Sequence, residues 1–345
     1  IIYPSQNHAD YMTTHEGAPI GGCRVIPNSI DLSMVARDVP RNPKKVVYCS
    51  SPDRGLHHLL SFWPEVRARV PDAELHIFYR LAPWIADVGA LGPWAGTHPD
   101  VCESARRARY VDEALRKLTA GDYGVVVRDL VPNVEMSREL ASAGVLAYPC
   151  DPLRYTEGFG VSALDAGAAG CQVLISDADA LPSIHGTYAT VITGRPDEHR
   201  QQWIETIITL LKADLPRLSV PAHYAHTAVT DRWEALIREQ LDFRVIPAQP
   251  AERPHFTHPE VGEALRVRQR GGFKFWETTV HGSWWSMEDE QVVRDRWWHP
   301  KEGEVVIDGG AAFGSYGLPA LAAGARVVCF SPAEPDTQCL VANLD

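Results

Sequence analysis

One stretch, residues 155–170, constrains the fold of this chain more than any other. The apolar run 145–148 precedes it and the apolar run 173–175 follows it, so we predict the order strand, glycine loop, helix, strand. Gly158 and Gly160 allow the backbone of this loop to come close to a ligand. The following helix presents unpaired N–H groups and a positive dipole end, so the pattern predicts a loop that faces a phosphate.

Two acidic residues flank the start of this helix. Glu157 stands before it and Asp165 follows eight residues later, about two turns at ~3.6 residues per turn. Both carboxylates can therefore line one side of the same cleft. The small residues 166–170 allow a second interpretation, in which a helix simply packs tightly on a sheet and ends at Gly170 as its cap. The motif alone does not separate the two interpretations.

At these residues the sequence resembles the donor-binding domain of retaining glycosyltransferases of group 1 type, which have the GT-B architecture of two facing Rossmann-like domains. The family motif is a Glu, seven residues and a second Glu, and here Glu157 and Asp165 occupy the two positions. The resemblance implies that Glu157 is catalytic and lies by the donor sugar and diphosphate, and that Asp165 contacts the ribose. It also implies that the donor-binding residues include Gly158, Phe159 and Gly160.

A second loop, residues 50–55, follows the predicted strand 46–49 and precedes a predicted helix. Arg54 lies where a guanidinium can bind two phosphate oxygens at once. In the family this loop supplies an Arg and a Lys to the diphosphate. Arg54, just before Gly55, takes the position of the Lys, and Ser50 and Ser51 take that of the Arg. The resemblance thus implies that Ser50, Ser51, Arg54 and Gly55 also bind the donor. The alternative is that Arg54 is a solvated residue at a helix start.

Strands alternate with helices from residue 45 to 241, which predicts an α/β fold with a parallel sheet covered on both faces. Ligands of such sheets bind beyond the carboxyl ends of the strands. We predict a remnant of the acceptor domain at 1–31 and a Rossmann-like donor domain at 32–246. Four prolines predict a linker at 247–259, followed by a second domain at 260–345.

In the second domain we predict a strand at 304–308, a glycine turn, a helix and a strand at 326–330. This segment resembles the first third of a Rossmann-like methyltransferase of the FkbM type. The resemblance implies that S-adenosylmethionine is the cofactor and that five residues bind it: Asp308, Gly310, Ala311, Gly314 and Ser331. A dinucleotide-binding turn and an ordinary strand-to-helix turn are the alternatives.

Composition excludes several classes of function. The net charge of -11 in 345 residues disfavours nucleic acid as a partner. No apolar run approaches the ~18 residues that span a bilayer, and no signal peptide is visible, so we expect no transmembrane segment and a cytoplasmic protein. The seven cysteines have no metal-binding or disulfide spacing, and the histidine pairs lack partners nearby in sequence, so we expect no metal.

Together these features predict a multidomain transferase that moves a sugar from a nucleotide-sugar donor to a glycan or other hydroxyl acceptor. The second domain would methylate a hydroxyl of the same or a related glycan. The alternative is a non-catalytic module that binds nucleotide-sugar or serves as a scaffold. Because the chain begins at Ile1 and holds two strands of the second domain, we expect a fragment that is incomplete for both activities.

Overall fold

The computed structural model describes residues 1–18, 23–90, 99–213, 215–242, 265–270, 273–278, 301–303, 305–308, 320–321 and 323–329. Contacts divide the chain into two compact units, Ile2–Asp231 and Arg232–Asp345 with Ile1. The predicted donor domain, 32–246, ends beyond the boundary between these units, and its exact limits stay a prediction. The proline-rich segment 247–259 lies outside the described residues.

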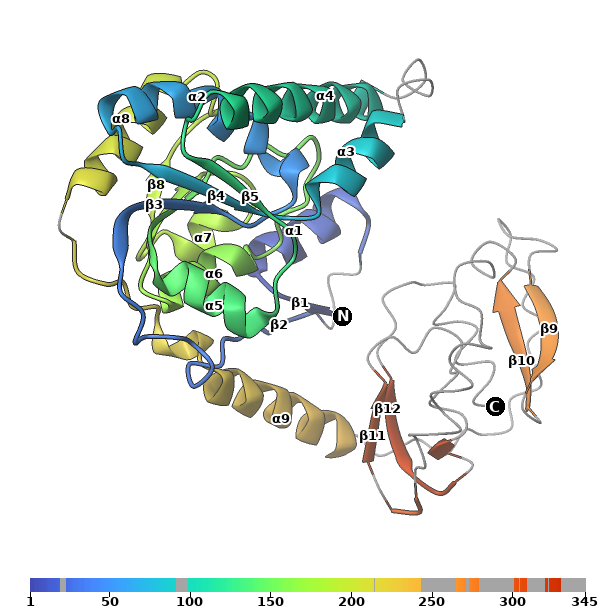
Figure 1. The fold of residues 1–345 in the computed structure, drawn as a ribbon. Coiled ribbons are helices and arrows are strands. Elements are labelled where there is room, and N and C mark those ends of the chain that lie inside the picture. Colours follow the sequence, from blue (N-terminus) through green and yellow to red (C-terminus); the bar gives the residue numbers. More distant parts are fainter. Residues whose placement is uncertain are drawn as a thin grey trace. The chain divides into compact units, whose positions relative to one another are not determined.

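The first unit is built on a six-stranded sheet in which every pair of neighbours is parallel (Figure 1). The strand order is β5-β4-β3-β6-β7-β8, so the chain starts in the middle, builds outward to one edge, and returns to build the other half. This confirms the predicted α/β, Rossmann-like architecture. The strands are β3 (Asn42–Tyr48), β4 (Glu74–Phe78), β5 (Val125–Arg128), β6 (Ala143–Tyr148), β7 (Gln172–Ser176) and β8 (Thr190–Ile192).

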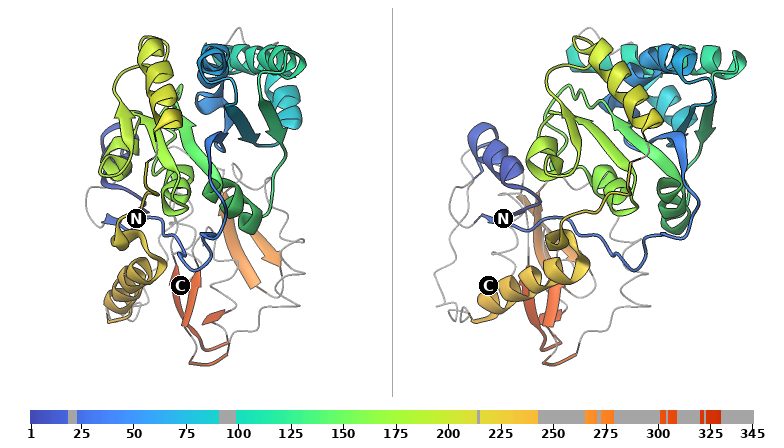
Figure 2. Two further views of the ribbon diagram at one scale, coloured as in Figure 1. Left: turned by 60° about the vertical axis from the view of Figure 1, so that its left-hand side comes forward. Right: turned by 90° about the vertical axis from the view of Figure 1, so that its left-hand side faces the viewer.

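Helices cover both faces of this sheet (Figures 1 and 2). One face carries α2 (Leu56–Arg69), α4 (Pro99–Ala120) and α8 (Arg200–Lys212), and α3 (Leu81–Ala90) packs on α4. The other face carries α5 (Asn133–Ala141), α6 (Val161–Ala168) and α7 (Leu181–His185). The sequence pattern does not indicate α3, and it predicts a helix only around 105–118, whereas α4 begins at Pro99.

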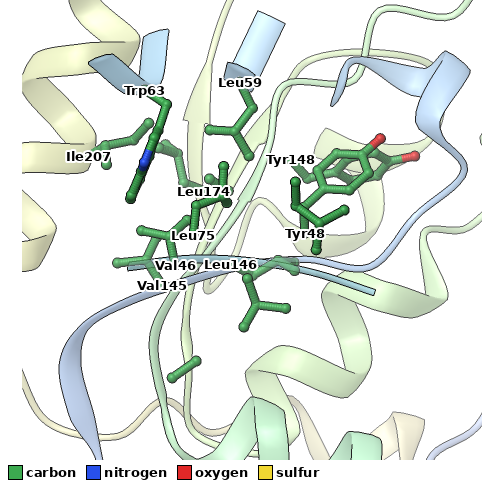
Figure 3. Close-up of a cluster of buried hydrophobic side chains, with 14 of the residues drawn as sticks. Val46, Tyr48, Leu59, Trp63, Leu75, Val145, Leu146, Tyr148, Leu174 and Ile207 are labelled. Carbon is green, nitrogen blue, oxygen red and sulfur yellow. The ribbon is translucent and has the colours of Figure 1, made fainter. Parts of the chain in front are cut away.

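Side chains from the sheet and the helices form one large core (Figure 3). Trp63 and Leu59 of α2 are fully buried against strand residues such as Val46. The indole N–H of Trp63 donates to the carbonyl of Tyr123 at 2.7 Å, so its one polar atom is satisfied inside the core. Tyr48 and Tyr148 lie at the carboxyl ends of β3 and β6, with buried rings in an edge-to-face arrangement 6.0 Å apart.

The N-terminal segment forms a small layer of its own. Strands β1 (Ile2–Tyr3) and β2 (Arg24–Val25) pair in parallel, and α1 (Gln6–His15) follows β1. The helix begins at Gln6 because the Ser5 side chain accepts a hydrogen bond from the amide of His8 at 3.1 Å and caps it. The sequence of residues 24–31 predicts a strand that closes in a turn, whereas β2 has two residues and only a single bridge, between Ile30 and Ala225, follows it.

Short helical turns and one long helix complete this part of the chain: η1 (Pro52–Arg54), η3 (Ala222–Tyr224) and α9 (His226–Asp242). α9 runs across the boundary at residue 231 between the two units. None of the helices in the described ranges combines the length and the apolar character that a bilayer crossing needs.

The second unit contains two strand pairs among its described residues. β11 (Val305–Asp308) and β12 (Arg326–Cys329) are parallel and lie where the sequence predicted strands. β9 (Leu265–Arg270) and β10 (Phe273–Thr278) form an antiparallel hairpin that the sequence analysis missed. Asp308 ends β11, whereas Gly310, Ala311, Gly314 and Ser331 lie outside the described residues. The methyltransferase assignment therefore stays a prediction.

Candidate functional site

The topology of the sheet itself indicates where a ligand binds. β3 and β6 are neighbours, but the chain leaves them toward opposite edges, so the loops that follow them diverge at their carboxyl ends. Open α/β sheets bind ligands at this switch point. The loop after β3 carries Arg54, and the loop after β6 carries Glu157.

Arg54 and Glu157 meet at this point although 103 residues separate them. The guanidinium Nη1 lies 3.0 Å from Oε2 of Glu157, and the hydroxyl of Tyr148 donates to the same oxygen. The Glu157 side chain is 8% exposed and that of Arg54 30%, so the arginine has the more open position. Burial lowers the pKa of Arg54, but Tyr148 and Glu157 raise it by more, and its pKa ends above the usual value. Arg54 is a cation at every relevant pH.

The guanidinium of Arg54 has donor capacity left. Its Nε is buried and has no hydrogen-bond partner among the described residues. A buried donor without a partner costs free energy. The Arg54 side chain as a whole is 30% exposed, so an anionic ligand can reach its guanidinium from solvent.

Two buried tyrosines hold the loop after β3. The hydroxyl of Tyr48 donates to the carbonyl of Ser51 at 2.8 Å, and Ser50 Oγ donates to the hydroxyl of Tyr148 at 3.0 Å. Ser51 Oγ donates to the carboxylate of Asp53. The hydroxyls of Ser50 and Ser51, predicted to bind the donor, are thus engaged within the protein, where they shape the loop.

Glycine is required at two predicted positions. Gly55 has φ +114°, and a Cβ there would lie 1.8 Å from the carbonyl oxygen of Pro149. Gly160 has φ +85°, and a Cβ there would lie 2.5 Å from a methyl group of Leu181. Both positions combine a backbone conformation that disfavours side chains with a close approach to neighbouring atoms. Gly55 brings the loop after β3 close to the loop after β6, and Gly160 brings the loop after β6 close to α7.

The side chain of Phe159 points into the protein interior, so only its backbone is available to the candidate site. Its side chain is buried and packs edge-to-face on His185 and Tyr224, with ring centroids 5.8 and 5.7 Å away. The ring of His185 also hydrogen-bonds to the Phe159 carbonyl, at 2.7 Å. This anchors the glycine loop, whose Gly158 carbonyl accepts from Ser5 Oγ at 2.7 Å.

Asp179 is a site residue that sequence reasoning missed. Its Oδ2 accepts the backbone N–H groups of Thr156 and Glu157 at 3.0 and 2.9 Å, so it fixes the segment that carries Glu157. Its φ of +49° is uncommon for a residue with a side chain and is tolerated best by Asn and Asp. The signal in the sequence was its position just beyond β7, since loops after parallel strands share one edge of the sheet.

Asp165 has different neighbours from Glu157. It lies on α6, and its charge acts on Cys49 and Tyr188. No hydrogen-bond donor to its carboxylate is found among the described residues. Burial raises the pKa of Asp165 from 3.8 to about 6. That Asp165 and Glu157 line one cleft, and that Asp165 binds a ribose, remain predictions.

This raised pKa predicts a measurable pH dependence. An acid whose pKa is higher in the folded state binds more protons there, so its contribution to stability falls as pH rises from about 4 to about 6. A shift of this size corresponds to at most about 3 kcal/mol. We expect Asp165→Asn to be more stable than the wild type at pH 7 and to lose this advantage at pH 4, as measured by urea denaturation.

Other carboxyl groups with shifted pKa values affect the wild type and Asp165→Asn equally. The hydrogen bond from Arg106 lowers the pKa of Glu103 to about 2, which gives a slope of the opposite sign at lower pH in both proteins. The difference between the two proteins isolates Asp165. A difference that is the same at pH 4 and pH 7 would contradict the prediction.

Arg107 of α4 links the two site loops from behind, and it too was missed. It is 3% exposed, and Nη1 donates to the carbonyls of Asp53, at 3.0 Å, and of Asp151. Nη2 bonds the Asp151 carboxylate at 3.1 Å, and Nε bonds Glu103 at 2.9 Å. One buried guanidinium therefore ties the loop after β3 to the loop after β6.

His57, His58 and Asp151 are the one group within the described ranges whose metal-ligand atoms lie close together, all within 4.8 Å. Burial lowers the pKa of His57 to about 3, so its ring is neutral. Asp151, however, already pairs with Arg107 at 3.1 Å, and Arg195 lies 3.9 Å from the same oxygen. Two cations on that carboxylate oppose a metal ion there, and the absence of a metal stays our prediction.

Comparisons with known proteins gave matches in structure alone. No family model matches the sequence, and no curated protein matches it. Sucrose-phosphate synthase from Thermosynechococcus elongatus is 16% identical with a TM-score of 0.44, over 70% of this chain and 58% of that one. The pneumococcal O-GlcNAc transferase GtfA, in complex with UDP and GlcNAc, is 14% identical with a TM-score of 0.49, over 70% and 45%.

HepE from Anabaena, in complex with UDP and glucose, is 14% identical with a TM-score of 0.45, over 69% of this chain and 62% of that one. The match thus spans less than two thirds of each of these three proteins. Similarities of this size do not assign a function to this chain.

Proposed function

We propose that residues 32–246 are the donor-binding half of a retaining glycosyltransferase of GT-B architecture, an enzyme that moves a sugar from a nucleotide-sugar donor to a glycan or other hydroxyl acceptor. The observation that carries this proposal is the meeting of Arg54 and Glu157 at the switch point of the sheet, beside the glycine loop that starts α6. A cation, a carboxylate and a helix start are the groups that a sugar diphosphate requires.

The phosphate half of the donor would bind the positive groups. The amides of Val161 and Ser162 open α6, and amides in the first turn of a helix have no partner within the helix. Together with Arg54 they can stabilise the charge that gathers on the diphosphate as it leaves. No metal ion is needed in this arrangement.

Glu157 would bind the sugar half of the donor. In the structure its carboxylate pairs with Arg54, so phosphate and carboxylate compete for one guanidinium. Donor binding would draw Arg54 toward the diphosphate and release Glu157 to accept hydrogen bonds from sugar hydroxyls. Tyr148 and Asp179 keep the Glu157 segment in place throughout.

Replacement of Arg54 tests this proposal. A charge-assisted hydrogen bond is worth about 1.5–3 kcal/mol, so Arg54→Ala should weaken the binding of UDP or GDP by about 10- to 150-fold in calorimetric titration. Arg116→Ala is the matched control, because Arg116 is an exposed arginine that pairs with Asp112 on the same helix. The control should keep wild-type affinity.

A second variant, at Glu157, distinguishes a specific loss of phosphate binding from general damage to the site loops. Glu157→Gln removes the competing charge and should leave nucleotide affinity equal or higher, while it abolishes sugar transfer in the full-length enzyme. Equal affinity of wild type and Arg54→Ala for both nucleotides would refute the proposed donor site.

For the second unit we propose the opening part of a methyltransferase domain that uses S-adenosylmethionine and would act on a glycan hydroxyl. Support comes from the parallel pairing of β11 with β12, since consecutive parallel strands require a crossover between them. Asp308 lies at the carboxyl end of β11, the end at which such folds bind ligands. Titration with S-adenosylhomocysteine tests this, and no binding would contradict it.

The competing candidate is a binding module without turnover. The hydroxyls of Ser50 and Ser51, where the family has a cation, are engaged within the protein, which favours this candidate. Hydrolysis of UDP-glucose by the full-length protein would distinguish the two, since a pure binding module releases no glucose.

A further inference from the structure

A groove of about 360 Å³ lies between α1 and the segment that leads to Glu157. Seven residues line it: Asn7, Asp10, Tyr11, Thr14, His15, Tyr155 and Asp179. Five of them come from α1, and the remaining two come from the loops after β6 and β7. Of these residues only Asp179 also supports the proposed donor site, through the segment that carries Glu157.

The groove is fixed to the catalytic segment. Tyr155 precedes Glu157 by two residues, and its hydroxyl donates to Asn7 Oδ1 at 2.8 Å. Its ring stacks on that of Tyr11 with centroids 4.2 Å apart. Asp179 binds the amide of Glu157 at 2.9 Å, so one carboxylate lines the groove and also positions the catalytic residue. A ligand in the groove would therefore contact the segment that carries Glu157.

The lining is rich in hydrogen-bond acceptors and carries negative charge. Asp10 and Asp179 contribute two carboxylates, and none of the seven lining residues is Lys or Arg. Gln6 bonds one oxygen of Asp10, and both amides bonded to Asp179 share its Oδ2, so each carboxylate keeps one oxygen for a ligand. Arg154, whose charge acts on Tyr11, pairs with Asp100. Such a surface favours a ligand with several hydroxyl or amino donors and repels an anion.

We propose that this groove binds the acceptor as a sugar whose hydroxyl or amino groups donate to Asp10 and Asp179. The inference rests on the proposed glycosyltransferase function, because only then is a hydroxylated ligand expected on the segment that carries Glu157. It commits to a neutral or amino sugar and excludes a uronic acid.

Saturation-transfer NMR with UDP present provides the test, with methyl glucoside, glucosamine and glucuronate as probes. The first two should bind and the third should not. The relative affinities of methyl glucoside and glucosamine show whether the groove prefers a neutral sugar or an amino sugar. Binding of glucuronate as strong as that of methyl glucoside would overturn the proposal.

Asp10→Ala and Gln6→Ala form a matched pair. Both break the hydrogen bond between Gln6 and Asp10 on α1, but only the first removes the carboxylate from the groove. Alanine suits a helix, so both variants should fold. Asp10→Ala should weaken binding of the two accepted probes by about tenfold, whereas Gln6→Ala should not. Equal affinities in the two variants would overturn the proposal.

UDP binding distinguishes a failure of the proposed acceptor groove from a failure of the proposed donor site. All three proteins should bind UDP equally, because Asp10 lies outside the proposed donor site. If UDP binds and the sugars do not, the acceptor groove is wrong and the donor site stands. If the wild type does not bind UDP, the proposed function itself fails.

Discussion

Arg107→Ala is expected to lower the free energy of unfolding by about 3–5 kcal/mol, the cost of leaving buried charges without their partner. Arg107 is 3% exposed, and its guanidinium serves four acceptors on Asp53, Asp151 and Glu103. Its removal would strand two carbonyls and a carboxylate in the interior. Burial by itself raises the pKa of the Asp151 carboxyl group. The hydrogen bond from His58 and the charge of Arg107 lower this pKa by more, so it lies below its usual value.

Arg106→Ala is the control for this measurement. Arg106 is the neighbouring residue on α4 and pairs with the same Glu103, but its side chain is 61% exposed. Exposed ion pairs contribute about 0–1 kcal/mol, so this variant should stay close to the wild type in urea denaturation. Similar losses for the two variants would show that Arg107 is not the link between the site loops.

Gly55→Ala is expected to cost about 2–5 kcal/mol of stability and to weaken nucleotide binding as well. The φ of +114° strains any residue with a side chain, and the added Cβ would lie 1.8 Å from the Pro149 carbonyl oxygen. To relieve this contact the loop with Arg54 must move away from the loop after β6. Chemical denaturation and UDP titration measure the two effects.

Gly89→Ala shows what the same substitution does where no constraint exists. Gly89 lies in α3, and a Cβ there would meet no atom within 4 Å. Alanine is favoured over glycine in a helix by about 0.5–1 kcal/mol, so this variant should match or exceed wild-type stability. If Gly55→Ala behaves like Gly89→Ala, the tight approach between the two loops is not a feature of the protein in solution.

Much of the fold could be predicted because its signals are local. Apolar runs such as 46–48 and 145–148 and the helical spacing of α2 repeat within a few residues, so alternating strands and helices followed from them. α3 was missed because it contains Pro83 and Gly89, which interrupt a helical pattern. The helix forms because it packs on α4, which is a tertiary effect.

The sequence placed Arg54 and Glu157 at the same edge of the sheet, because each follows a strand that the alternation makes parallel. It also indicated that Gly158 and Gly160 give the loop after the strand 145–148 freedom to come close to a ligand. Loop position and backbone freedom are properties of a short segment, so sequence alone determines them.

The tertiary structure decided which partners these residues have. Arg107 comes from a helix 54 residues away from Asp53. Asp179 comes from a loop 22 residues beyond Glu157. Phe159 turned inward, away from the site, because His185 and Tyr224 offer its ring a buried place. Such contacts depend on how elements distant in sequence pack together, and no local pattern of residues records that packing.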